Sequence, residues 1–264
     1  MVDRKSEAGE PALITDPLEL AEKEAENALA QFDWGMEELD RWLSAKKPKI
    51  RVSTILDLHR IALQEIHRDA GNFRPAGVAI KGSEHEPVTN ADVPRFVEEM
   101  IEYLDSNWDR KTAIHLSAYV MWRLNWIHPF SDGNGRTSRI FSYMILCAKM
   151  ETQLPGDNTI PEQVSENKVP YYKALEFADA AYKSNKIDLT EMEELMEDYL
   201  ANQLVDIHDK ATGNRDAIVK RASENERDSD EKRPTKIVGI IESHPVISTA
   251  ILGLLVVIIG AIVS

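Results

Sequence analysis

The sequence predicts a mostly α-helical protein with one main folded body and one membrane-spanning segment near its C-terminus. Apolar residues recur at helical spacing along most of the chain, and there is no alternation of strands and helices of the kind that builds a parallel sheet. A run of nineteen uncharged residues, 245–263, follows a strongly polar stretch. With 264 residues, 43% of them hydrophobic and 29% charged, the chain can bury a sizeable core and is not mostly disordered.

The first ninety residues are expected to form a flexible lead, three helices and a loop. Residues 1–17 lack the apolar core of a secretory signal and are expected to form a flexible lead. Two helices are expected within 18–50. Thr15 or Asp16, followed by Pro17, is the start signal of the first helix, and the second covers 36–45 and ends at Lys46, Lys47 and Pro48. Residues 53–69 are a strongly periodic helix. Glycines and prolines over 70–90 then predict a loop with a small β-hairpin.

The rest of the body is expected to be helical. The periodic segments are 92–104, 111–126, 135–150, 170–183 and 189–204. His59 and His67 on the helix 53–69, and His115 on 111–126, are expected to be packing or surface groups. Cys147 is the one cysteine, which excludes an intramolecular disulfide and a cysteine-based zinc site. The formal net charge of −14 excludes a sequence-independent grip on nucleic acid.

The C-terminal region is expected to anchor the protein in a membrane. Residues 208–236 form a charged linker, and residues 237–264 contain a juxtamembrane stretch and the uncharged run. As a helix the run would be about 28 Å long, close to the hydrocarbon thickness of a bilayer. Lys232, Arg233 and Lys236 precede it and favour a body on the cytoplasmic side. We therefore expect a single-pass C-terminal anchor with the body facing the cytoplasm.

The segment 125–139, with the sequence NWIHPFSDGNGRTSR, carries the chemistry. Gly133, Asn134 and Gly135, here called the glycine nest, form a turn at the start of a helix, where backbone N–H groups converge on an anion. Arg136 and Arg139 are three residues apart and share one helix face, so both can reach one polyphosphate.

Two further residues of this segment supply a base and a metal ligand. His128 can accept a proton near neutral pH, and Asp132 can offer an oxygen to Mg²⁺ while nucleotide phosphates complete the shell. Taken singly, each group is ordinary. Their conjunction within twelve residues predicts attack on a phosphate by a hydroxyl that His128 deprotonates.

The stretch HPFSDGNGRTSR resembles the signature of the Fic family, His-x-Phe-x-(Asp/Glu)-Gly-Asn-Gly-Arg-x-x-Arg, at every defined position. The resemblance extends over about 51–204, and we assign a Fic domain to 51–207. It implies an all-α bundle with a small β-hairpin flap. It also implies an adenylyltransferase (AMPylator), which transfers AMP from ATP to a Ser, Thr or Tyr hydroxyl of a target protein.

The resemblance also implies residue roles. His128 would be the general base, Asp132 would hold Mg²⁺ (or Mn²⁺), and the glycine nest would bind phosphate. Arg136 would add phosphate contacts, and Arg139 would bind the γ-phosphate. Phe130 would be buried under the loop. Residues 78–88 look like the flap, which in the family aligns the target backbone by strand pairing.

Fic proteins are often restrained by a helix with the pattern (Ser/Thr)-x-x-x-Glu-(Gly/Asn), so the helices of 18–50 are a candidate inhibitory region. Glu26 with Asn27 fits the end of that pattern, although Glu22 stands where Ser or Thr belongs. Glu19 is the second candidate. We prefer Glu26, which would pair with Arg139 and displace the γ-phosphate.

Other interpretations stay open at this point. The same loop could use another nucleotide or phosphoryl donor, or remove AMP with Glu26 positioning water. The protein could instead be an inactive, membrane-anchored binding module. The target protein, the nucleotide, the membrane and a homo-oligomeric state are not fixed by the sequence.

Overall fold

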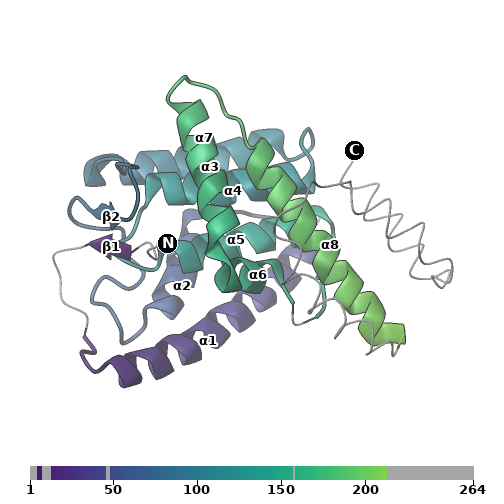
Figure 1. Ribbon diagram of the computed structural model, residues 1–264, viewed down its shortest axis with the longest axis horizontal. Helices are drawn as coiled ribbons and strands as arrows, with labels where there is room; N and C mark the ends of the chain where they lie inside the picture. Colours follow the sequence, from purple (N-terminus) through teal and green to yellow (C-terminus); the bar gives the residue numbers. More distant parts are fainter. Residues whose placement is uncertain (1–4, 8–12, 46–47, 157, 213–264) are drawn as a thin grey trace.

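The computed structural model describes residues 5–7, 13–45, 48–156 and 158–212, and Figure 1 shows their arrangement. The hydrophobic run 245–263 and most of the charged linker lie outside these residues. The fold is mostly helical, as the sequence predicts. The elements in chain order are β1 (Lys5–Glu7), α1 (Pro17–Leu43), α2 (Val52–Ala62), β2 (Ala79–Lys81), the 3₁₀ turn η1 (Asn90–Asp92), α3 (Val93–Asn107), α4 (Ala113–Ile127), α5 (Asn134–Lys149), α6 (Ile160–Glu166), α7 (Lys168–Tyr182) and α8 (Thr190–Thr212).

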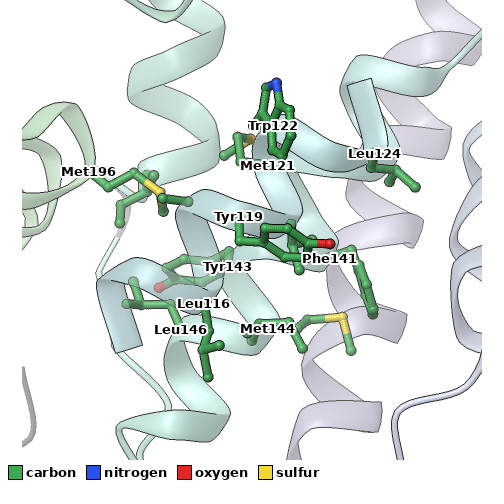
Figure 2. Packing of buried hydrophobic residues seen from close by; sticks show 14 of the residues in the cluster. Leu116, Tyr119, Met121, Trp122, Leu124, Phe141, Tyr143, Met144, Leu146 and Met196 are labelled. Atoms are coloured by element: carbon green, nitrogen blue, oxygen red, sulfur yellow. The ribbon is translucent and has the colours of Figure 1, made fainter. Parts of the chain in front are cut away.

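Helices α4 and α5 form the centre of the core, and both are buried along most of their length. Their large side chains interdigitate, as Figure 2 shows for Tyr119 of α4 and Phe141 of α5. Small residues bring the two backbones together: the Ser117 hydroxyl donates to the Ser142 carbonyl (2.7 Å), and the Ser142 hydroxyl donates to the Ser117 carbonyl (2.9 Å). Because the connection 128–133 joins this buried pair, it has a rigid base.

Helix α1 is one continuous helix, whereas the sequence suggests two. Its start agrees with the prediction, since the Asp16 carboxylate caps the backbone N–H groups of Leu18 and Glu19, both at 2.9 Å. Gly35 interrupts the apolar pattern but not the helix. A side chain there would have its Cβ 3.1 Å from Cγ2 of Ile140, so the glycine allows α1 to pack closely on α5.

The expected β-hairpin is wrong. Within the flap region 78–88 one short strand, β2, is found, and its partner is the distant strand β1. The two strands are antiparallel, with Ser6 opposite Ile80. Part of the expected flexible lead therefore belongs to the fold, and Figure 1 shows β1 beside β2.

Helix α8 continues to Thr212, past the expected start of the linker at 208. Gln203 attaches it to the core, because its amide donates to the Tyr143 hydroxyl (2.8 Å) and to the Pro155 carbonyl (3.1 Å). Among the residues placed by the structure, no helix is both long and apolar enough to cross a bilayer. The predicted membrane segment is not among those residues.

Candidate active site

The connection between α4 and α5 has a backbone that only a few residue types adopt. His128 ends α4 in the left-handed region (φ 52°, ψ 59°), and its N–H donates to the Leu124 carbonyl at 3.0 Å. Gly133 precedes α5 with φ 73°. A Cβ on Gly133 would lie 2.4 Å from Cδ2 of Leu63, so both the dihedral angle and the space favour glycine. These two turns direct the connection back across the end of the core.

Asn134 holds the connection in shape through its side chain. The amide is buried, accepts a hydrogen bond from the Phe130 N–H (3.0 Å) and donates to the Phe130 carbonyl (2.8 Å). Asn134 therefore offers an anion only its backbone N–H. No side chain caps the N-terminus of α5, and Thr137 N–H to the Gly133 carbonyl (3.0 Å) is a first-turn bond of the helix. The N–H groups of this first turn are directed toward the site, so the positive end of the α5 helix dipole faces it.

His59 packs against the connection 128–133 and holds it by a hydrogen bond, a role that the sequence does not indicate. Its ring is buried and stacks on Phe130 with centroids 3.7 Å apart and an interplanar angle of 6°. Nδ1 accepts from the Gly71 N–H and Nε2 donates to the Asp132 carbonyl, both at 3.0 Å. This pairing requires a neutral ring, and burial lowers the pKa of His59 to about 4. Phe130 is buried, as expected.

Arg74 ties the loop to the flap region. Its Nε donates to the His128 carbonyl (2.8 Å), its Nη1 donates to the Ala76 carbonyl (2.9 Å), and its Nη2 donates to the Val88 carbonyl. Its own N–H donates to the Pro129 carbonyl at 2.9 Å. This buried guanidinium therefore connects the position of His128 to residues 76–88. A lone arginine in a loop gives no such signal in a sequence.

The His128 imidazole is buried and points into a cavity. Burial lowers its pKa to about 3, the Asn125 carbonyl acts in the opposite direction, and the charges of His85 and Arg74 lower it further. Nδ1 has no hydrogen-bond partner of good geometry among the described residues, but the Asn125 backbone carbonyl, which can only accept, raises the pKa of the ring. We assign the ring proton to Nδ1 on this basis, which leaves Nε2 as an acceptor toward the cavity. The imidazole is thus neutral and able to take a proton.

The cavity has a volume of about 560 Å³, a size that suits a nucleotide-sized ligand. The structure places around it all the residues that the motif singles out for chemistry. They are His128, Asp132, Gly133, Asn134, Gly135, Arg136 and Arg139. Lys168, Tyr171 and Tyr172 of α7 also line the cavity. One cationic rim and one helix N-terminus therefore face a single space, which suits a polyanion.

Asp132 is the carboxylate suited to a metal ion. Half of its side chain is exposed, Oδ1 accepts from the Gly133 N–H (2.6 Å), and Oδ2 lies 3.4 Å from Nη2 of Arg136. No group of three or more metal-binding side chains occurs in the part of the chain that the structure describes. A single carboxylate beside a phosphate site fits Mg²⁺, which takes most of its other ligands from phosphates and water.

Helix α1 brings Glu24, and not Glu26, to the cavity. Glu26 is 69% exposed and pairs with Lys23 at 3.0 Å, so the structure does not place it against Arg139. The Glu24 carboxylate lies 3.1 Å from Nη1 of Arg136 and lines the cavity. Glu19 is in the first turn of α1 and does not line it.

Buried amides explain this register. Asn27 donates to the Gln64 carbonyl (2.8 Å), and Gln31 donates to the Leu58 carbonyl (3.0 Å), so both satisfy carbonyls at the end of α2. Glu24 lies three residues before Asn27 and shares its helix face.

Ser6 is the other residue that the sequence does not indicate. It is the central residue of β1, and its hydroxyl oxygen lies 2.8 Å from Nε2 of His128. With the tautomer assigned above, the hydroxyl donates and the imidazole accepts. A neutral base, a hydroxyl and an anion site therefore meet in one cavity, which is the arrangement needed for transfer of a phosphorus-centred group to an alcohol.

Residues 49–146 match the model of the Fic/DOC family. The proteins named "Protein adenylyltransferase Fic" from Drosophila persimilis and Nematostella vectensis are similar in sequence. The fly protein is 31% identical over 157 residues, which is 58% of this chain, and the anemone protein is 30% identical over 122 residues, which is 46% of this chain. Both alignments span 28% of the length of the relative.

Solved structures show the same fold. Fic-1 from C. elegans matches with a TM-score of 0.55 and 22% identity, over 72% of this chain and 53% of the nematode chain. A Fic family protein from Desulfovibrio desulfuricans matches with a TM-score of 0.50 and 18% identity, over 92% of this chain and 64% of the other. The helical fold of this chain is therefore shared with these proteins.

Proposed function

We propose that this chain, whose residues 49–146 match the Fic/DOC family model, is a protein adenylyltransferase that transfers AMP from ATP to a hydroxyl of a protein. The observation that carries the proposal is the 2.8 Å contact between a serine hydroxyl and Nε2 of a neutral, buried His128, beside a cavity lined by the whole motif. The names of the sequence relatives support the same reaction.

In the proposed reaction each residue has a distinct task. His128 takes the proton of the attacking hydroxyl, and the buried surroundings keep it neutral until then. The N–H groups at the start of α5 and the guanidiniums of Arg136 and Arg139 stabilise charge on the transferred and leaving phosphates. Asp132 would hold Mg²⁺, which when bound neutralises phosphate charge and orients the triphosphate.

We further propose that α1 restrains the enzyme through Glu24. Its carboxylate forms an ion pair with Arg136, a cation that would otherwise bind phosphate, and adds a negative charge to the cavity. Substitution of Glu24→Gln should raise labelling with ATP because it frees Arg136 and removes this charge. Glu26→Gln is the matched control on the same helix, since Glu26 is exposed and outside the cavity. A rise with Glu26→Gln and none with Glu24→Gln would return the role to the residue that the sequence favours.

We also propose that residues 245–263 anchor the protein in a membrane, with the catalytic body on the cytoplasmic side. Support comes from the nineteen uncharged residues and from Lys232, Arg233 and Lys236 before them. In cell fractionation the full chain should resist extraction by alkaline carbonate. A chain ending before residue 237 that sediments in the same way would contradict the anchor.

Mass spectrometry tests the reaction directly. Membranes containing the full chain are incubated with ATP and Mg²⁺, and the modified proteins are identified by the mass of the adduct, which separates AMP from UMP and phosphate. We expect an AMP adduct with the wild type and a loss of at least about 100-fold with His128→Ala. His115→Ala, which changes a histidine outside the cavity, is the control. No adduct with either the wild type or Glu24→Gln would leave the inactive binding module as the interpretation, and release of AMP from a modified target would indicate the reverse reaction.

A further inference from the structure

The N-terminal strand presents a hydroxyl to the catalytic base from within the same chain. Ser6 lies opposite Ile80 in the β1–β2 ladder, and its side chain lines the cavity that holds the motif. We infer that Ser6 is an acceptor of the protein's own transfer reaction, so that the chain modifies itself at this residue. This inference rests on the proposed function.

Strand pairing explains why Ser6 reaches the base. β1 adds to the edge of β2 as an extended peptide does in β-augmentation, where main-chain bonds set the register and place each side chain. That register puts the Ser6 hydroxyl 2.8 Å from Nε2 of His128, within the distance that a general base needs.

Two other serine hydroxyls near the site have different partners. Ser83 also lines the cavity, but its Oγ accepts from the His85 N–H. Ser131 donates to the Asp69 carboxylate at 3.0 Å. Among the residues that the structure describes, Ser6 is the one whose hydroxyl is bonded to His128. The contact with His128 therefore selects Ser6 over these two serines.

The proposed step is balanced with a nucleoside triphosphate as the second reactant. A bond forms between Oγ of Ser6 and the α-phosphorus, and the bond from that phosphorus to the oxygen bridging to the β-phosphate breaks. The bonding electrons leave with pyrophosphate, and the hydroxyl proton passes to Nε2 of His128. Nothing is oxidised or reduced. The product is an AMP phosphodiester on Ser6.

The covalent connection favours reaction within one molecule. The Leu13 N–H donates to the Ile66 carbonyl at 2.9 Å, which holds the chain beside the end of α2. Five residues lie between Glu7 and Leu13, so Glu7 can lie no more than about 20 Å from Leu13. A tether this short gives the hydroxyl an effective concentration of about millimolar. Self-modification should therefore proceed at a rate that does not depend on protein concentration.

Peptide mapping of the full chain in membranes, after incubation with ATP and Mg²⁺, tests the assignment. The wild type should carry AMP on the peptide that contains Ser6. Ser6→Thr should carry it on the new hydroxyl, Ser6→Ala should lose it there, and His128→Ala should reduce it at least about 100-fold. In a mixture, His128→Ala protein with an intact Ser6 should not be labelled by the Ser6→Ala variant, because the reaction is intramolecular.

The outcomes separate this inference from the proposed function. AMP on other proteins or on other residues of this chain, with none on Ser6, would overturn the inference and leave the transferase standing. AMP on Ser6 of the His128→Ala protein in the mixture would overturn the intramolecular assignment. Absence of AMP from every protein, also with Glu24→Gln, would overturn the proposed function and the inference together.

Discussion

Protonation of His59 should destabilise the protein at mildly acidic pH. The folded state needs a neutral ring, because Nδ1 accepts the Gly71 N–H, and it keeps the pKa at about 4. In the unfolded chain a histidine has a pKa of about 6.5. Between these two values the unfolded state binds more protons than the folded state, so stability falls as the pH falls and is complete only above about pH 6.5.

The magnitude follows from the difference between the two pKa values. A pH of about 5 lies roughly 1.5 units below the unfolded-state pKa. At 1.36 kcal/mol per unit, protonation of His59 in the unfolded state lowers the free energy of unfolding by about 2 kcal/mol. The assay is urea unfolding of the full chain, followed by tryptophan fluorescence, at about pH 7 and about pH 5. The variant His59→Gln cannot titrate, so its stability should fall by about 2 kcal/mol less than that of the wild type over this interval. Equal losses in both proteins would refute the buried, neutral role of His59.

Two substitutions and one pH profile test the loop itself. Gly133→Ala should destabilise the fold by about 1–2 kcal/mol, because alanine is strained at φ 73° and its Cβ meets Leu63; unchanged urea unfolding would contradict this. Asn134→Ala should cost about 1–3 kcal/mol and most of the transfer activity, since it leaves the buried N–H and carbonyl of Phe130 unpaired; full activity in the labelling assay would show that the loop keeps its shape without the amide. The acid limb of kcat/KM should lie well below pH 6.5, because burial lowers the pKa of His128 to about 3; a limb near pH 6.5 would mean that the imidazole is solvated.

The sequence predicts those parts of the fold and the site that depend on neighbouring residues. Amphipathic periodicity gives the helices, and the Asp16 cap marks the start of α1. The motif loop is contiguous, so its histidine, acid, glycines and arginines necessarily meet near one helix end. Their spacing is enough to place them together without knowledge of the rest of the chain.

The parts that depend on distant residues are those that the sequence does not predict correctly. The prediction of Glu26 as the inhibitory residue rests on a local sequence pattern. The face of α1 that meets the cavity is set instead by hydrogen bonds from Asn27 and Gln31 to residues of α2 and just after it. A hairpin is a reasonable expectation for a segment punctuated by Gly82 and Pro87. The strand there pairs instead with residues 5–7, whose sequence KSE has no β-forming pattern.

The pairing of β1 with β2 has a consequence for how an outside protein gains access to the base. The side of the cavity that would bind phosphate is the start of the buried helix α5. The side that holds Ser6 is the three-residue strand β1, which is attached only through its pairing with β2. Residues 5–7 and a foreign extended segment cannot occupy that edge at the same time. Under the proposed function, a target segment would have to displace residues 5–7 from β2, so the choice of acceptor would depend on the concentration of the target as well as on its sequence.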